Sequence, residues 1–258
     1  MKRRRRGGPK APHIPRLARL VAAVAPFLGL APTAASGQAL RLENENVYGF
    51  ALFDILEVAP ALDGRPVGWD MIASIGREYD RFWITSDGDL STSTRSGEVD
   101  VQGLYSRMIG SYWNLQAGAR VELSYGEDVT STRGHVTFGL QGLAPYWFEL
   151  TPQLYVSQDG DVAAALEASY DLFVTQRLIL QPRLDAAAAW QEVTDWGVGS
   201  GLNSIALQAR LRYEIRREFA PYVGIRWSRL LGGTADMALA EGDDVREIGF
   251  VAGFRVWR

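Results

Sequence analysis

The chain has 258 residues, 27 of them basic and 30 acidic, and a formal net charge of −3. It holds no cysteine, which excludes disulfides and thiolate metal sites. Residues 1–39 carry eight of the basic residues and no acidic one, so the remainder has a charge near −11. An acidic body of this kind argues against nucleic acid as a partner.

Residues 1–39 have the pattern of a secretory signal peptide. A basic start is followed by the apolar stretch LVAAVAPFLGLAP, which is too short to span a membrane, and then by the small residues of TAASGQA. We therefore predict cleavage near Gly37 or Ala39, with residues 40–258 exported as one domain. A disordered basic tail on a cytosolic protein is the alternative.

From residue 46 onward, apolar and polar residues alternate with the two-residue period of β-strands. The clearest run is 205–216, in which a helix would spread the arginines around its whole circumference. We expect about twelve strands of this kind. They cover 46–58, 67–76, a short stretch near 82–86, 99–108, 112–125, 135–143, 148–156, 164–172, 178–190, 205–215, 223–228 and 247–257.

The connections predict an all-β fold, a single antiparallel transmembrane β-barrel with short periplasmic turns and longer outer loops. Short joints follow every second strand, whereas long polar joints follow the third, fifth, ninth and eleventh, including the insert 87–100. Pro152 and Pro182 lie inside strands, where we expect local bulges. The first strand mixes its faces, so its orientation stays open. Two aromatic girdles are expected at the run ends, from Trp113, Tyr146, Trp147 and Phe219 at the turns and Trp69, Tyr125, Trp190 and Trp227 toward the loops.

Periodicity alone does not say which face points inward, because a lipocalin-like calyx has the same alternation with its apolar face inside. With the apolar face outward, charged side chains fill the lumen, where they either form a salt-bridged interior or line a path for a small cation. The expected lumen charges are Arg120, Glu122, Glu149, Glu167, Asp171, Arg183, Asp185, Arg210, Arg212, Glu214 and Arg255.

Several long motifs resemble one family, the copper resistance protein B family of outer-membrane proteins. They include GLAPYWFEL (142–150), EASYDLFVTQRLILQPRLD (167–185) and LRYEIRREFAPYVGIRW (211–227), and the resemblance extends over the chain from Asn46. It implies an outer-membrane barrel that binds copper, helps the cell to tolerate copper, and works with periplasmic copper proteins such as a multicopper oxidase. Outer-membrane lipid and lipopolysaccharide would surround it.

Many members of that family carry a Met- and His-rich segment before the barrel, and this chain lacks it. Such thioether and imidazole ligands suit copper, especially Cu(I). Beyond residue 39 the chain has one histidine and three methionines, with no spacing typical of a metal motif. The remaining metal candidates are weak and lie in or beside the outer loops: His135, Met237, Glu241, Asp243 and Asp244.

The leading hypothesis is non-enzymatic: a barrel for copper binding and homeostasis, whose charged lumen passes copper. One alternative is an outer-membrane phospholipase, which would need a serine oriented by His135. The other is a structural barrel that docks a periplasmic copper protein, which the sequence does not separate from the first.

Overall fold

The structure is a computed structural model that describes residues 46–60, 66–93, 96–126 and 130–258. The predicted signal peptide lies outside these residues. Within them the chain forms thirteen strands and one α-helix. Their bounds are β1 Tyr48–Val58, β2 Val67–Gly76, β3 Asp80–Leu90, β4 Gly97–Gly110, β5 Trp113–Tyr125, β6 Thr130–Ala144, β7 Phe148–Ser157, β8 Val162–Ser169, β9 Leu172–Phe173, β10 Leu178–Ala189, β11 Gly201–Tyr213, β12 Phe219–Leu230, α1 Gly232–Glu241 and β13 Arg246–Trp257.

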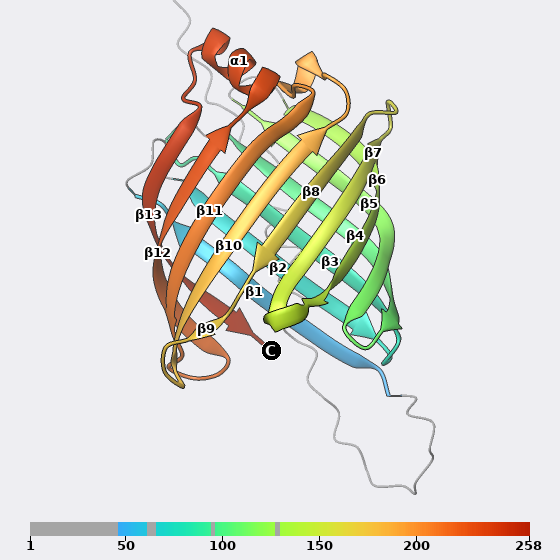
Figure 1. The fold of residues 1–258 in the computed structure, drawn as a ribbon, viewed down its shortest axis with the longest axis vertical. Helices are drawn as coiled ribbons and strands as arrows, with labels where there is room; N and C mark the ends of the chain where they lie inside the picture. The colour runs from blue at the N-terminus through green and yellow to red at the C-terminus, as the bar shows by residue number, and fades with distance from the viewer. Residues whose placement is uncertain (1–45, 61–65, 94–95, 127–129) are drawn as a thin grey trace, which may run out of the picture. The chain divides into compact units, whose positions relative to one another are not determined.

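The strands pair antiparallel with their neighbours in the chain and close into a barrel, because β1 pairs with β13 and β10 with β11 (Figure 1). The short β9 continues β8, since both pair with β10 in the same register. Twelve strands therefore run along the wall, as predicted, and none of the described helices is long and apolar enough to cross a membrane.

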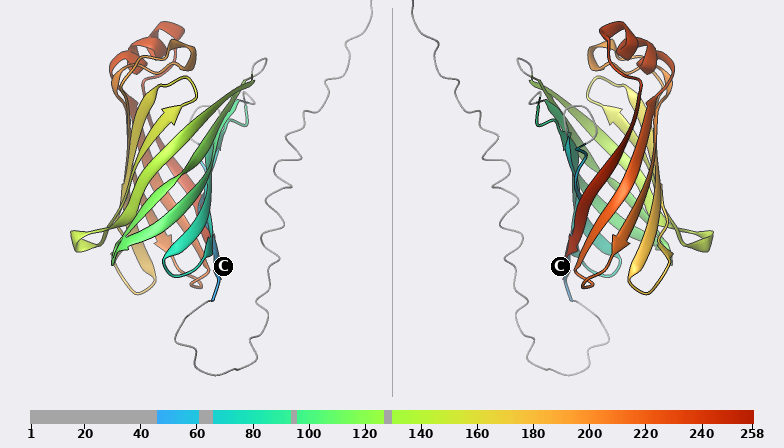
Figure 2. Two further views of the ribbon diagram at one scale, coloured as in Figure 1. Left: turned by 90° about the vertical axis from the view of Figure 1, so that its right-hand side faces the viewer. Right: turned by 90° about the vertical axis from the view of Figure 1, so that its left-hand side faces the viewer.

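The connections differ between the two ends of the barrel. At the end that we call the turn end lies the C-terminus, and at the opposite loop end lie α1 and the longest joints (Figure 2). The joint after the fifth strand was expected to be long, yet β5 ends at Tyr125 and β6 begins at Thr130, because both strands extend further than the alternation predicted. The predicted polar insert 87–100 is mostly strand, because β3 runs to Leu90 and β4 begins at Gly97. Its acidic residues suggested a loop, yet Asp87, Asp89 and Glu98 lie on the inner wall, where polar side chains are solvated or paired.

The apolar face of each strand points outward. On β11, Leu207 is 48% exposed, whereas the alternating Arg210 and Arg212 are each 3% exposed. On β12, Val223 is 60% exposed, whereas Arg226 lines the interior. The lipocalin-like alternative, with the apolar face inside, is therefore wrong.

One strand contains a bulge, whereas two bulges expected at prolines are absent. The register of β1 against β2 shifts between Phe53 and Ile55, so Asp54 and Ile55 both line the interior, which is why this strand mixes its faces in the sequence. The bulges expected at Pro152 and Pro182 are absent from the pairings of β7 and β10 with β6 and β8. Each ladder is interrupted beside the proline and resumes in the same register, because the missing N–H removes a bond without requiring an extra residue.

Exposed aromatic side chains gather at the turn end. Tyr146 is 84% exposed and Trp147 65% exposed, and Trp147 stacks edge-on with Tyr112. Phe219 belongs to the same belt, while Trp113 packs against Gly142 and lines the interior. At the loop end, Trp190 is the exposed member of the four expected aromatics, because Trp69, Tyr125 and Trp227 are only partly exposed.

Gly253 on β13 offers a test of the packing of the inner wall. A Cβ there would lie 2.3 Å from the Leu56 carbonyl oxygen and 2.8 Å from the Tyr222 hydroxyl. We expect Gly253→Ala to lower the free energy of unfolding by about 1–3 kcal/mol, the usual cost of overpacking. Urea titration in detergent, followed by tryptophan fluorescence, measures it.

The matched control is Gly103→Ala on β4, where an added Cβ meets nothing within 4 Å. Equal unfolding midpoints for the two variants would contradict the close approach at Gly253.

Candidate functional site: the charged lumen

The inner face encloses a cavity of about 1210 Å³. Its lining reaches from Asp243 and Asp244, beside α1 at the loop end, to Ser111 and Tyr112 at the turn end. Among the described residues, fourteen carboxylates and eight arginines line it, an excess of six negative charges when all are ionised. A lumen of this composition favours cations over anions.

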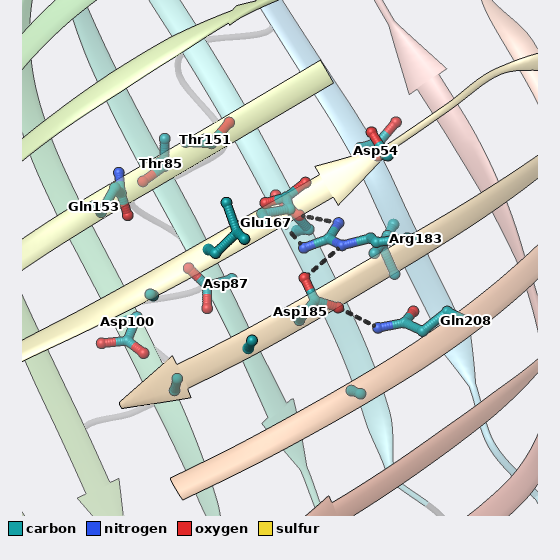
Figure 3. A pocket seen from close by; sticks show the side chains of 18 of the residues that line it. Asp54, Thr85, Asp87, Asp100, Thr151, Gln153, Glu167, Arg183, Asp185 and Gln208 are labelled. Carbon is teal, nitrogen blue, oxygen red and sulfur yellow. Dashed lines mark hydrogen bonds and ion pairs between the residues drawn. The ribbon is translucent and has the colours of Figure 1, made fainter. Parts of the chain in front are cut away.

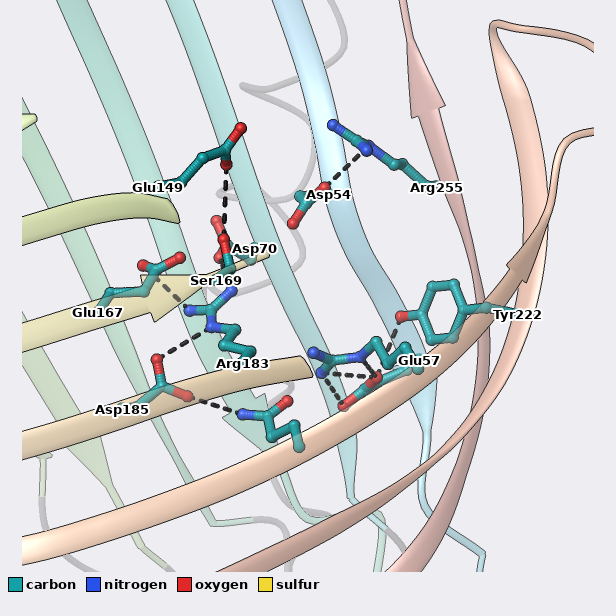
Figure 4. Close-up of polar contacts among 12 residues, drawn as sticks. Asp54, Glu57, Asp70, Glu149, Glu167, Ser169, Arg183, Asp185, Tyr222 and Arg255 are labelled. Carbon is teal, nitrogen blue, oxygen red and sulfur yellow. Dashed lines mark hydrogen bonds and ion pairs between the residues drawn. The ribbon is translucent and has the colours of Figure 1, made fainter. Parts of the chain in front are cut away.

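Three arginines on neighbouring strands bind carboxylates on strands that do not adjoin their own. Figure 4 shows the surroundings of Arg183 and Glu57, which belong to two of these contacts. We call these contacts the cross-lumen pairs. They join β10, β11 and β12 to β2, β1 and β3, respectively, and so tie together parts of the sheet that are not neighbours. The pairs are Arg183–Asp70 at 3.0 Å, Arg210–Glu57 at 3.0 Å and Arg226–Asp89 at 3.2 Å.

Arg183 is the most highly connected of these arginines (Figure 3). Besides Asp70, its guanidinium contacts Glu167 at 3.2 Å and Asp185 at 2.9 Å. The Gln208 side-chain amide donates to Asp185 at 2.9 Å and holds that carboxylate in place. One positive charge therefore faces three negative ones, which leaves a local surplus of negative charge in the middle of the lumen.

The pair Arg210–Glu57 is the most deeply buried. Arg210 is 3% and Glu57 5% exposed, and the Tyr222 hydroxyl donates to the same carboxylate at 3.0 Å. The guanidinium also lies over the Tyr222 ring, 5.6 Å from its centroid. Gly253 leaves the space in which Tyr222 sits. Because both charges are desolvated, removing either one alone leaves the other unpaired at high cost.

Four acidic residues stand directly opposite one another on four neighbouring strands, and we call them the acidic row. Asp70 on β2 pairs in register with Asp87 on β3, Asp87 with Asp100 on β4, and Asp100 with Glu122 on β5. Arg183 binds Asp70 from across the lumen, and Arg120 binds Asp100 through two hydrogen bonds of 2.6 and 2.7 Å. Like charges in directly opposed positions destabilise a sheet, so the row costs stability.

The structure brings most of the predicted lumen charges onto the cavity wall. Arg212 is buried at 3% exposure and bonds Asp171 at 2.7 Å, whereas Glu214 lies beyond the end of β11, in the turn to β12. Glu122 lines a second cavity at the loop end. Those on the wall of the main cavity are Arg120, Glu149, Glu167, Asp171, Arg183, Asp185, Arg210 and Arg255.

Four of the five weak metal candidates line one cavity. His135, Met237, Glu241 and Asp243 line the second cavity, which has a volume of about 670 Å³ and lies between the strands and α1. Asp244 lines the main cavity instead. Sequence spacing did not place β6 and α1 together, because the two elements are far apart in the chain.

Sequence reasoning missed several inner-wall charges. Asp54 lies in the irregular part of β1 and Glu57 follows it, so the phase of both was hidden. Asp54 pairs with Arg255 at 2.8 Å. Others lay in the insert taken for a loop. Arg226 and Asp70 were detectable, because each alternates with apolar neighbours on its strand. The missed charges on the wall of the main cavity are Asp54, Glu57, Asp70, Arg81, Asp87, Asp89, Glu98, Asp100, Arg226, Arg229, Arg246 and Glu247.

Comparison with known proteins agrees with the resemblance carried by the motifs. The sequence model described as "Copper resistance protein B precursor (CopB)" matches residues 47–258. The chain belongs to the copper resistance protein B family. It is 38% identical over 220 residues to Copper resistance protein B of Escherichia coli, covering 85% of this chain and 73% of that protein. It is 37% identical over 217 residues to the Copper resistance protein B homolog of Pseudomonas syringae pv. tomato, covering 84% and 72%.

Among solved structures, this copper resistance protein B family barrel is similar to a KdgM porin and to a NanC porin. The TM-scores are 0.46 and 0.48, with 10% identity in both cases. Each match covers 81% of this chain and 98% of the porin.

The family makes copper the relevant cation, so the donors of the lumen can be compared with its chemistry. No group of three or more His, Cys, Asp or Glu side chains in the described ranges is arranged to hold a metal ion. The main cavity offers mainly carboxylate oxygens, which suit hard cations better than Cu(I). An imidazole and a thioether, donors that suit copper better, lie in the second cavity at His135 and Met237, while the Met108 thioether lines the main cavity.

The buried pair gives a second stability test. We expect Arg210→Met to lower the free energy of unfolding by about 3–5 kcal/mol, because Glu57 is left as an uncompensated buried charge. The double variant Arg210→Met with Glu57→Leu should recover most of that loss. Urea titration in detergent measures all three proteins.

Arg107→Met is the matched control, because Arg107 and Asp80 form an exposed pair at 4.0 Å whose loss should change little. A cost for Arg210→Met no larger than that of Arg107→Met would contradict the burial argument.

Proposed function

We propose that this copper resistance protein B family member is an outer-membrane barrel that admits copper ions to its acidic lumen and thereby serves copper resistance. The acidic row carries the proposal. Opposed carboxylates destabilise a sheet, and a barrel that needed only a salt-bridged interior would have no use for them. Rows of carboxylates are a known means of selecting cations in pores.

The outward face supports the membrane location. Large apolar side chains such as Val223, Ile248 and Phe250 are more than half exposed within their strands. A contiguous apolar surface of this kind is stable only when lipid or another apolar partner covers it. The aromatic belt with Tyr146 and Trp147 at the turn end fits a membrane–water interface.

The cross-lumen pairs would set the narrowest part of the path. An ion that passes Arg183 must share the carboxylates of Asp70, Glu167 and Asp185 with that guanidinium. Such competition makes binding weak enough for the ion to leave again, which conduction requires. The arginines thus set width and affinity, while the surplus acids set the sign of the passing charge.

Removing lumen acids should weaken cation passage. We expect the double variant Asp87→Asn with Glu149→Gln to lose cation preference and to take up copper severalfold more slowly, because both carboxylates line the main cavity. Reversal potentials in planar bilayers under a salt gradient measure the preference. Quenching of a copper-sensitive dye inside proteoliposomes measures the uptake.

The control is Glu214→Gln with Glu218→Gln, which changes the charge equally in the β11–β12 turn. If both double variants behave like the unaltered protein, copper does not pass along the lumen acids.

Removing the central arginine should act in the opposite direction. In Arg183→Gln, three carboxylates lose their common partner, so we expect higher cation conductance and stronger cation preference. Single-channel recordings test this, with Arg107→Gln at the exposed turn end as the comparison. Conductance that stays the same or falls would show that Arg183 does not narrow the path.

A further inference from the structure

The second cavity is covered by one face of α1. Thr234, Met237, Ala238 and Glu241 all line it, and their spacing places them on one side of a helix. The remaining lining comes from the strands below, including β6 with His135. The segment expected to be a polar loop is thus a helix whose inner face closes a chamber at the loop end.

Hydrogen bonds fix this helix to the barrel. Thr234 Oγ1 accepts from the Gly199 N–H and from Asn203 Nδ2, both at 2.8 Å. Asn203 is itself buried, at 8% exposure, and also donates to the Gly199 carbonyl oxygen at 2.5 Å. Met237 lies one turn beyond Thr234 on the same face, so the contacts of Thr234 hold the thioether over the chamber.

His135 faces the chamber from β6, with its side chain only 7% exposed. Its Nδ1 is buried and has no hydrogen-bond partner among the described residues. Its Nε2 lies 3.9 Å from the Glu122 carboxylate, and the Tyr155 ring packs edge-on at 6.2 Å between centroids. A buried imidazole with an unsatisfied nitrogen costs free energy, so this side chain calls for an explanation.

The charges around His135 come from several strands. Arg120 on β5 lies directly opposite His135 and is bound by Asp100. Arg133, two residues before His135 on β6, is bound by Asp161. Glu98, Glu122, Glu241 and Asp243 complete the charged lining of the chamber. Because the two arginines are paired, the remaining carboxylates make the chamber attractive to a cation.

We propose that His135 and Met237 bind Cu(I) in this chamber, at the entrance to the lumen. Imidazole and thioether are soft enough to select Cu(I), which accepts few ligands, whereas carboxylates alone favour hard ions. The proposal deepens the proposed function by naming a binding site for the copper ion, and it rests on that function. The acidic row begins at Glu122, beside His135, and leads from the chamber into the main cavity.

Cu(I) binding to the purified full chain in detergent tests the site. The protein competes for Cu(I) with a chromophoric chelator under anaerobic, reducing conditions, and X-ray absorption identifies the donor atoms. We expect one Cu(I) per barrel with nitrogen and sulfur donors. His135→Gln and Met237→Leu should each weaken the affinity by at least about tenfold, the loss that follows even from removing an outer-shell partner.

Met71→Leu is the matched control, because Met71 on β2 lines neither cavity and its loss should leave the affinity unchanged. Met237→Leu keeps the shape of a side chain on α1, outside the strands, so a folded barrel is expected even if His135→Gln does not fold. Absence of Cu(I) binding, or equal affinities for Met237→Leu and Met71→Leu, overturns the site.

The proposed function and the Cu(I) site can be contradicted independently of each other. Tight Cu(I) binding that depends on Met237, together with uptake that is unaffected by Asp87→Asn and Glu149→Gln, supports the site and removes the lumen path. Uptake that depends on those acids, together with no Cu(I) binding, supports the path and overturns the site.

Discussion

The twelve strands close with their charged face inward, so the arginines and carboxylates on that face find their partners inside the barrel. The cross-lumen pairs supply such partners for three of the arginines. Arg210 and Glu57, on β11 and β1, form a nearly dry pair that also engages Tyr222. A desolvated pair of this kind contributes little net stability by itself, yet losing one partner is costly. The pairing therefore fixes which parts of the wall face each other.

The carboxylates of the lumen outnumber the arginines, and the two kinds of charge are unevenly distributed among the strands. Asp87 sits between Asp70 and Asp100 in the acidic row, while the arginines concentrate on β10, β11 and β12. The strands β2 to β5 thus present mainly carboxylates to the lumen, with Arg81 and Arg120 among them, whereas most of the guanidinium groups come from β10 to β13. In the proposed function, a cation moving along these strands would meet carboxylates that are shared with arginine, which would keep its binding favourable but weak.

The loop end adds donors of another kind. In the second cavity, the donors that suit copper are His135 on β6 and Met237 on α1. In the proposed function, the hard oxygen donors along the main cavity would serve passage of the ion, and the softer donors at the loop end would bind it. Relatives described as copper resistance proteins share the barrel sequence, since the aligned region covers most of residues 47–258.

The sequence by itself determined the strands, their number, the end at which the short joints lie and the family. A strand with one apolar and one polar face shows a two-residue alternation in the sequence, so it can be recognised without the fold. The phase of β1 was lost at its bulge, and the strands through 87–100 were hidden because acidic residues next to glycine have the composition of a loop. Only the closed barrel decided which face points inward. It also decided which charges pair, because Arg183 and Asp70 are brought together by closure and no local pattern records that contact. The same holds for His135 and Met237, which share a chamber only because α1 folds over the mouth of the barrel.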